Sequence, residues 1–208
     1  MFLIINSLII CTSCGNEEKK INKNSSERFE EQASEGTYRA ILRPLNNHLS
    51  GYLPTGLAEI EIKNGQLVVS TLLDDDAKVL HIQSIQNGTR CPDLADDLNQ
   101  DGIIDIEEAT AIAGEVLIHL DGALDGGLEG DGLYPWGSGF SYKKSGDLTA
   151  IENEIKLRTK KNFSLTDRVV MIYGVSKTTR LPDTVATRSQ LPKTSTIPVV
   201  CGIIKKVK

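Results

Sequence analysis

Two runs of alternating apolar and polar residues flank an Asn-Gly pair, and this pattern limits the fold more than any other feature of the chain. The first run covers residues 57–63 and the second covers residues 66–73, with Asn64 and Gly65 between them. Strict alternation indicates strands with one buried face, and Asn-Gly is a residue pair that two-residue hairpin turns prefer. The sequence therefore predicts an antiparallel hairpin whose apolar face lies on a core.

Further strands are predicted along the rest of the chain, over residues 38–42, 79–85, 116–120, 140–142, 148–157, 168–174 and 197–207. The last contains Pro198 and is predicted to be an edge strand, because proline cannot donate to a central ladder. Residues 182–198, rich in Thr, Ser and Pro, are expected to form a long loop. Many short strands with one brief helical stretch predict a mainly β fold, an antiparallel β-sandwich or partly closed barrel. We expect it to be a single domain over residues 37–208.

The chain begins with an uncharged apolar run over residues 1–11. This run is shorter than the about 20 residues of a membrane-spanning helix and has the length of a secretory signal core. The small residues Thr12 and Ser13 then precede Cys14. This arrangement resembles the lipobox of bacterial lipoproteins, in which the cysteine is lipidated and becomes the first mature residue. The resemblance implies a signal peptide over residues 1–13, a lipid on Cys14, and anchoring in the bacterial cell envelope, at the outer membrane or cell surface.

Two features differ from the usual lipobox: no Lys or Arg precedes the apolar run, and Cys11 stands where Leu is common. The alternative is an N-terminal strand buried in the domain. Residues 15–36 are rich in Glu, Lys, Asn and Ser, a composition that buries too little apolar surface to order itself. We therefore expect a flexible tether from the lipidated cysteine to residue 36, with room for a short helix over residues 26–33.

The formal net charge of −5 hides a very uneven distribution. Residues 91–142 hold 12 acidic residues and no Lys or Arg, whereas residues 143–208 hold 14 basic and 5 acidic residues. The acidic total excludes nucleic acid as the main partner, because phosphate binding requires a basic surface. An acidic stretch repels itself unless positive charge lies against it. We expect a bound cation there, together with contacts from the basic C-terminal third.

Residues 97–108, DLNQDGIIDIEE, lie inside the acidic stretch and match the pattern D-x-[DN]-x-[DN]-G-x5-E at every position. They resemble the EF-hand calcium loop, in which the glycine permits a positive φ at the sharp turn. The resemblance implies Ca²⁺ as the cofactor. The implied ligands are the side chains of Asp97, Asn99, Asp101, Asp105 and Glu108 and the backbone carbonyl of Ile103. Oxygen ligands with a bidentate Glu suit Ca²⁺ better than the smaller, octahedral Mg²⁺.

The flanks of this loop differ from those of a regular EF-hand. Pro92 leaves room for one helical turn before the loop, and a short helix after it is expected to end at Gly114. Residues 122–132 are acidic and Gly-rich but lack the register of a second loop, so they predict a solvated turn rather than a second ion site. A single loop inserted between strands favours structural calcium binding over a calcium sensor.

Cys91 and Cys201 remain once the signal peptide and the lipidated cysteine are set aside. Two thiols in an exported domain favour a disulfide, which would tie the acidic stretch to the C-terminal strand. The alternative is a pair of buried free thiols.

Several short motifs in residues 37–205, including His81-Ile82 and residues 88–92, 120–122 and 168–174, are similar to CHRD-type β-domains of exported bacterial proteins. That family is defined by its fold and implies no catalytic activity. The three histidines, His48, His81 and His119, stand alone in the sequence, and lone strand histidines are usually structural.

These features together predict a calcium-binding exported lipoprotein without enzymatic activity, in which Ca²⁺ stabilises a β-domain. Its partners are the membrane, through the lipid anchor, and a surface or periplasmic protein. The alternatives are a calcium-dependent adhesin or partner-binding module, and a hydrolase whose site the sequence does not reveal. Trp136, in the aromatic segment 134–140, is either a ligand platform or a residue packed on the end of the sandwich.

Overall fold

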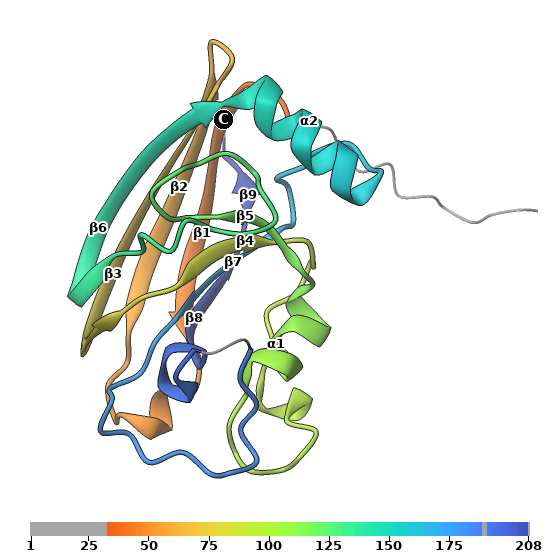
Figure 1. The fold of residues 1–208 in the computed structure, drawn as a ribbon. Helices are drawn as coiled ribbons and strands as arrows, with labels where there is room; N and C mark the ends of the chain where they lie inside the picture. Colours follow the sequence, from red (N-terminus) through yellow and green to blue (C-terminus); the bar gives the residue numbers. More distant parts are fainter. Residues whose placement is uncertain (1–32, 189–190, 208) are drawn as a thin grey trace, which may run out of the picture.

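The computed structural model describes residues 33–188 and 191–207. Nine strands form one antiparallel sheet in the order β5-β4-β7-β8-β1-β2-β3-β6, with β9 beside β1 (Figure 1). The strands are β1 (Gly36–Pro44), β2 (Thr55–Lys63), β3 (Gln66–Leu80), β4 (Gln83–Gln86), β5 (Val116–His119), β6 (Trp136–Asp147), β7 (Val169–Tyr173), β8 (Pro198–Ile203) and β9 (Lys205–Lys206). The sheet curls into a half-barrel, so the prediction of a mainly β fold with a partly closed barrel is confirmed.

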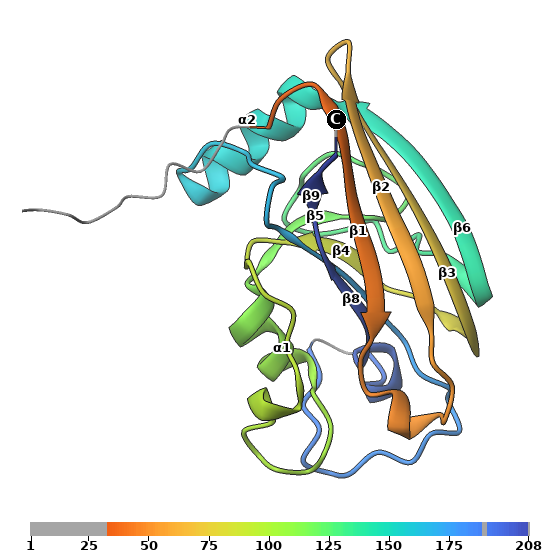
Figure 2. The same cartoon turned by 180° about the vertical axis from the view of Figure 1, so that it is seen from behind.

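Two α-helices and three 3₁₀ turns complete the described part of the chain. They are α1 (Ile106–Ala113), α2 (Leu148–Thr159), η1 (Asn47–Leu49), η2 (Leu94–Asp96) and η3 (Lys193–Ser195). Both views place α2 at one end of the half-barrel and α1 toward the other (Figure 2). None of the described helices has the length and apolar character needed to span a membrane.

The predicted hairpin is β2–β3. Asn64 and Gly65 have φ values of 52° and 72°, the two positive angles that this type of turn requires. The register pairs Lys63 with Gln66, and it holds the alternate residues of both strands on the core side. The alternation in the sequence therefore sets the register, since a slip of one residue would expose every buried side chain.

Residues 148–157 were predicted as a strand, and this prediction is wrong: they form α2. Asp147 ends β6 and accepts a hydrogen bond from the backbone N–H of Ala150 at 2.8 Å, which caps the helix. Ile151 and Ile155 are buried four residues apart, on one helical face. Lys160, at φ 61°, ends the helix.

Several predicted strands have other boundaries or positions. The strand predicted over residues 140–142 is part of the longer β6. The run over residues 79–85 is divided between two strands. β3 continues through three aspartates and ends at Leu80, and β4 begins at Gln83. The segment containing Pro198 is not an edge strand, since β8 lies between β7 and β1. Proline is tolerated there because it is the first residue of the strand.

The half-barrel has a core on each face. Along β7, Val170 and Ile172 join the large inner cluster, whereas Val169, Met171 and Tyr173 join a second cluster on the outer face. Residues of α1 and of the loop before it complete the outer cluster. This outer core fixes the acidic loop to the sheet.

Cys91 and Cys201 are bonded, with Cα atoms 5.9 Å apart, so the disulfide prediction is confirmed. The ordered domain begins before residue 37, since the backbone N–H of Ala33 donates to the Phe163 carbonyl at 2.9 Å. The predicted signal peptide, Cys14 and the rest of residues 1–32 lie outside the described residues.

Candidate metal centre

The acidic loop begins at a single helical turn, η2, as Pro92 in the sequence predicts. Asp93 and Asp96 form a reciprocal cap at its start. The guanidinium of Arg90 forms a bidentate ion pair with Asp96, at 2.8 Å for both bonds, and it lowers the pKa of that carboxyl. Since Cys91 is disulfide-bonded beside this turn, the entry to the loop is fixed.

The loop then turns sharply around the oxygens of its first residue. Gln100 and Gly102 have φ values of 59° and 85°, in the left-handed region where glycine is favoured. The N–H of Gly102 donates to Oδ2 of Asp97 at 2.7 Å. The backbone therefore wraps around the carboxylate at position one of the motif.

The next two candidate ligands also lie inside short side-chain turns. Oδ1 of Asn99 accepts from the N–H of Asp101 at 2.9 Å, and Oδ1 of Asp101 accepts from the N–H of Ile103 at 2.9 Å. Successive turns of this kind hold side-chain oxygens at alternate positions along the loop.

Glu108 closes the loop by reaching back to its start. Its Oε1 accepts from the N–H groups of Leu98 and Asn99 at 2.8 and 3.3 Å, and its Oε2 accepts from that of Asp105 at 3.1 Å. Only 7% of Glu108 is exposed. The last residue of the motif thus bridges the first turn of the loop and the first turn of α1.

Asp105 is the N-cap of α1. Its Oδ1 accepts from the N–H groups of Glu107 and Glu108 at 2.9 and 3.1 Å. The helix runs to Ala113 and ends at Gly114, at φ 81°, as the sequence predicts. The carboxylate at position nine is therefore fixed by the fold and faces the same loop as Glu108.

The donor set fits Ca²⁺ in its chemistry. Oδ1 of Asp97 is buried and has no hydrogen-bond partner in the described structure, although it belongs to the first candidate ligand. The other carboxylate oxygens of the candidate ligands accept from backbone N–H groups, except Oδ2 of Asp101, which accepts from a hydroxyl group. Across the described ranges, no three Asp, Glu, His or Cys side chains meet at metal-binding distances. The oxygens belong to one loop, and apart from Oδ1 of Asp97 they are hydrogen-bonded by the loop itself or by Thr184 and Ala186.

Asn46 contacts the backbone of Ile104, the eighth residue of the motif. Its Oδ1 accepts from the N–H of Ile104 at 2.9 Å, and its Nδ2 donates to the carbonyls of Ile104 and Pro198 at 2.8 and 3.0 Å. Asn46 is buried and has φ 51°. Sequence reasoning missed it, because it lies 58 residues from Ile104 and no pattern links the two.

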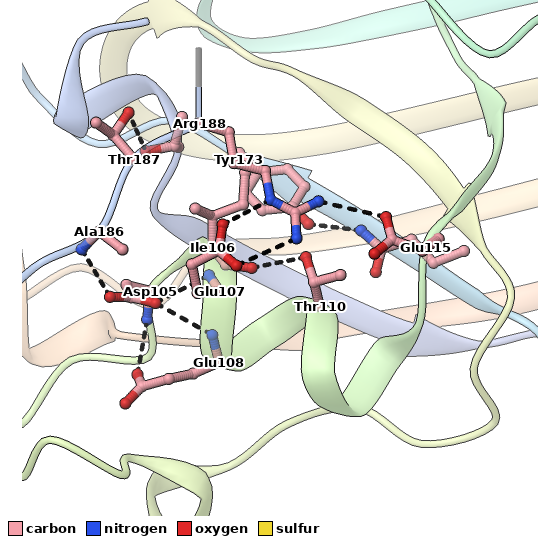
Figure 3. A network of polar contacts seen from close by, with 12 residues as sticks. Asp105, Ile106, Glu107, Glu108, Thr110, Glu115, Tyr173, Ala186, Thr187 and Arg188 are labelled. Atoms are coloured by element: carbon pink, nitrogen blue, oxygen red, sulfur yellow. Dashed lines mark hydrogen bonds and ion pairs between the residues drawn. The ribbon is translucent and has the colours of Figure 1, made fainter.

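A segment of the predicted long loop, residues 184–188, lies across the outer side of the acidic loop, and we call it the strap. The hydroxyl of Thr184 donates to Oδ2 of Asp101 at 2.6 Å. The N–H of Ala186 donates to Oδ2 of Asp105 at 2.7 Å (Figure 3). Two candidate ligands are thus held in place from outside the motif.

Arg188 ends the strap between two carboxylates. Its guanidinium lies 2.7 Å from Glu107 and 3.4 Å from Glu115 (Figure 3). The pKa of Glu107 is lowered by its hydrogen bond to Arg188. The expectation that the C-terminal third contacts the acidic stretch is confirmed at this residue, which belongs to a loop rather than to a strand.

The Gly-rich segment 122–132 folds around an acidic pair. Asp121 is 1% exposed, and its pKa is raised by burial and by the neighbouring Asp131. The pKa of Asp131 is lowered, chiefly by the backbone N–H groups of Leu133 and Gly122. Because the shifts are opposite, Asp121 binds a proton more readily than Asp131 does.

The histidines and the tryptophan that the sequence singles out lie apart from the acidic loop. His81 is buried, with its ring nitrogens 3.2 and 3.1 Å from the carbonyls of Tyr173 and Gly137. His119 contacts the hydroxyl of Tyr134 at 2.8 Å. Trp136 is 57% exposed at the start of β6, so it is not packed on the end of the fold.

No protein-family model and no curated protein matches this chain.

Proposed function

We propose that this chain is an exported lipoprotein whose β-domain binds one Ca²⁺ in the loop 97–108 to stabilise its acidic segment. One observation carries the proposal. The side chain of Glu108 reaches back over the start of the loop, while Oδ1 of Asp97 is buried without a partner. A buried, unpaired carboxylate oxygen costs free energy, and a bound cation removes this cost.

The backbone supports the same proposal. The positive φ angles at Gln100 and Gly102 bend the chain so that alternate side-chain oxygens line one loop. Asp105 and Glu108 are fixed at the start of α1. Bound Ca²⁺ would supply positive charge to these carboxylates, which otherwise repel one another. With Ca²⁺ bound, the backbone N–H groups that donate to Glu108 would form some of their hydrogen bonds with water or with other oxygens of the loop instead.

The role of the ion is structural in this proposal. The loop is fixed by the disulfide before it, the outer core behind it and the strap beside it. Extracellular calcium modules bind at about 10⁻⁴–10⁻³ M, which suffices where free calcium is millimolar. A hundredfold excess of Ca²⁺ over Kd stabilises the native state by about 2.7 kcal/mol.

Thermal unfolding of the purified protein tests the proposal. The midpoint should rise between EDTA and a calcium concentration far above Kd, and it should rise less with Mg²⁺. The double variant Asp97→Asn/Glu108→Gln should lose the calcium response and still fold, because its amides replace the carboxylates at similar volume.

Glu129→Gln is the matched control, since it removes one carboxylate at an exposed position of the Gly-rich segment. It should keep the full calcium response. A midpoint that is the same in EDTA and in saturating calcium would overturn the proposal.

The anchoring part rests on the sequence of residues 1–14. Incorporation of labelled palmitate into the protein, lost in Cys14→Ser, tests it. Soluble secretion of the unchanged chain would contradict it.

A calcium-dependent adhesin or partner-binding module is the second candidate. The observation that favours it is the exposure of apolar side chains beside the Gly-rich segment, with Leu133 72% and Trp136 57% exposed. Solvent-exposed apolar groups gathered in one place mark interaction surfaces. Binding of the protein to envelope fractions, lost in Trp136→Ser and in EDTA, would favour this candidate over a purely structural role.

A further inference from the structure

The outer face of the sheet contains a cavity of about 810 Å³ between α1, the Gly-rich segment and the end of α2. Ligand sites of drug-sized molecules usually have roughly 300–1,000 Å³. Most of the surface that lines it is apolar, although polar and charged residues also contribute. The aliphatic side chains of the lining are Leu80, Ile82, Ile106, Val116, Leu128 and Leu191. Of the residues that line the cavity, Ile106 alone belongs to the loop 97–108.

The floor of the cavity carries a short chain of buried polar groups. The amide Nε2 of Gln86 donates to the hydroxyl of Tyr173 at 2.5 Å and to that of Ser84 at 3.4 Å. Gln86 is 1% exposed, and its Oε1 has no partner among the described residues. Because an amide can turn over, its free atom is an acceptor in one orientation and a donor in the other.

A ligand hydroxyl satisfies either orientation, since it both donates and accepts. Two guanidinium groups line the cavity near its floor, and Nε of Arg158 is the one nitrogen of the two that has no hydrogen-bond partner among the described residues. Arg188, which lies next to Tyr173 (Figure 3), is paired with Glu107 and Glu115. The two Nη atoms of Arg158 donate to backbone carbonyls.

We propose that this cavity binds a neutral amphiphile, which is an apolar molecule with one hydroxyl group. The hydroxyl group forms a hydrogen bond with the unpartnered amide atom of Gln86, and the apolar part of the molecule packs against the apolar lining. An anionic amphiphile would bring a carboxylate beside Glu115, which lines the same cavity. Lys161, Arg158 and Arg188 line the same cavity and are the cations that such a ligand would need. The experiment therefore compares an alcohol with its acid.

Displacement of the neutral fluorescent probe N-phenyl-1-naphthylamine from the purified full chain, with calcium present throughout, tests the proposal. The probe should bind with a single saturable phase. 1-Decanol should displace it at about tenfold lower concentration than decane or decanoate, a ratio that corresponds to about 1.4 kcal/mol. Stronger displacement by decanoate, or equal displacement by decane, would overturn the assignment of the ligand class.

Two variants locate the site. Thr110→Trp places an indole at a wall position on α1 and should abolish probe binding. Ala111→Trp, at the exposed neighbouring position, is the matched control and should leave binding unchanged. Gln86→Leu should remove the preference for decanol over decane and keep probe binding. Unchanged probe binding in a folded Thr110→Trp variant would show that the probe binds elsewhere and overturn the proposal.

The two proposals, ligand binding in the cavity and calcium binding in the loop, are tested by independent measurements. The cavity experiment measures probe fluorescence, whereas the calcium experiment measures the shift of the unfolding midpoint. Glu108→Gln should abolish the calcium-induced shift of the unfolding midpoint. It should leave unchanged the order in which decanol, decane and decanoate displace the probe.

Discussion

Asn46 is a buried link between the acidic loop and the sheet. Asn46→Ala should lower the free energy of unfolding by about 2 kcal/mol, because it leaves the buried N–H of Ile104 and the carbonyl of Pro198 without partners. Alanine at φ 51° adds backbone strain. Denaturant unfolding measures the change. Asn47→Ala, at an exposed position, should change stability by less than about 0.5 kcal/mol. An equal loss in both variants would contradict the role of Asn46.

Asp121 should make stability depend on pH. Its pKa is raised in the fold above the ordinary value of 3.8, so the native state binds more protons than the unfolded state. Stability from this group is therefore present at low pH and is lost as pH rises through the folded pKa. Asp121→Asn is neutral at every pH, so it should be more stable than the parent near neutral pH, and the difference should disappear below pH 3.8. Unfolding midpoints across this range measure it. A gain that is the same at all pH values would contradict this cause.

At the scale of elements, the helix α2 depends on its cap. Asp147→Ala should cost about 1 kcal/mol, because the N–H of Ala150 loses its acceptor. Asp147→Asn keeps a capping oxygen and should be close to the parent. The free energies of unfolding of the two variants, measured in urea, give the comparison. Equal losses in both would point to the charge rather than to the cap.

The elements that the sequence predicts best are those specified by local patterns. Alternation around Asn64 and Gly65 gives the hairpin and its register, and the motif spacing gives the start and end of α1. The strand predicted for residues 148–157 is wrong because a short apolar run fits both periods. The spacing of Ile151 and Ile155 fits a helix, but this spacing alone does not exclude a strand. The cap at Asp147 and the burial of both isoleucines in the inner core favour the helix.

The parts of the site that the sequence does not predict come from long-range contacts. The strap reaches the loop from 81 residues away, through Ala186 and Asp105, and it has no motif of its own. The central position of β8 likewise follows from its pairing with β7 and β1. Composition and spacing identify the loop, and only the folded sheet decides which distant residues surround it.

At the scale of the whole molecule, the disulfide lowers the conformational entropy of the unfolded chain. The bond between Cys91 and Cys201 spans 110 residues, and the chain-entropy model assigns about 4–5 kcal/mol to a closure of this length. The variant Cys91→Ser/Cys201→Ser should lose stability of this order. The parent in reducing agent should unfold at the same midpoint as the variant in thermal unfolding. A midpoint that reduction leaves unchanged would contradict the prediction.

The half-barrel ends at β6, which pairs only with β3 in the part of the chain that the structure describes. A long strand with one free side can add a strand from another molecule and start aggregation. Lys143 and Lys144 are exposed side by side near the middle of β6. Two adjacent positive charges on a free edge repel the same edge of a second copy, and this protects the protein against edge-to-edge association where its copies are crowded.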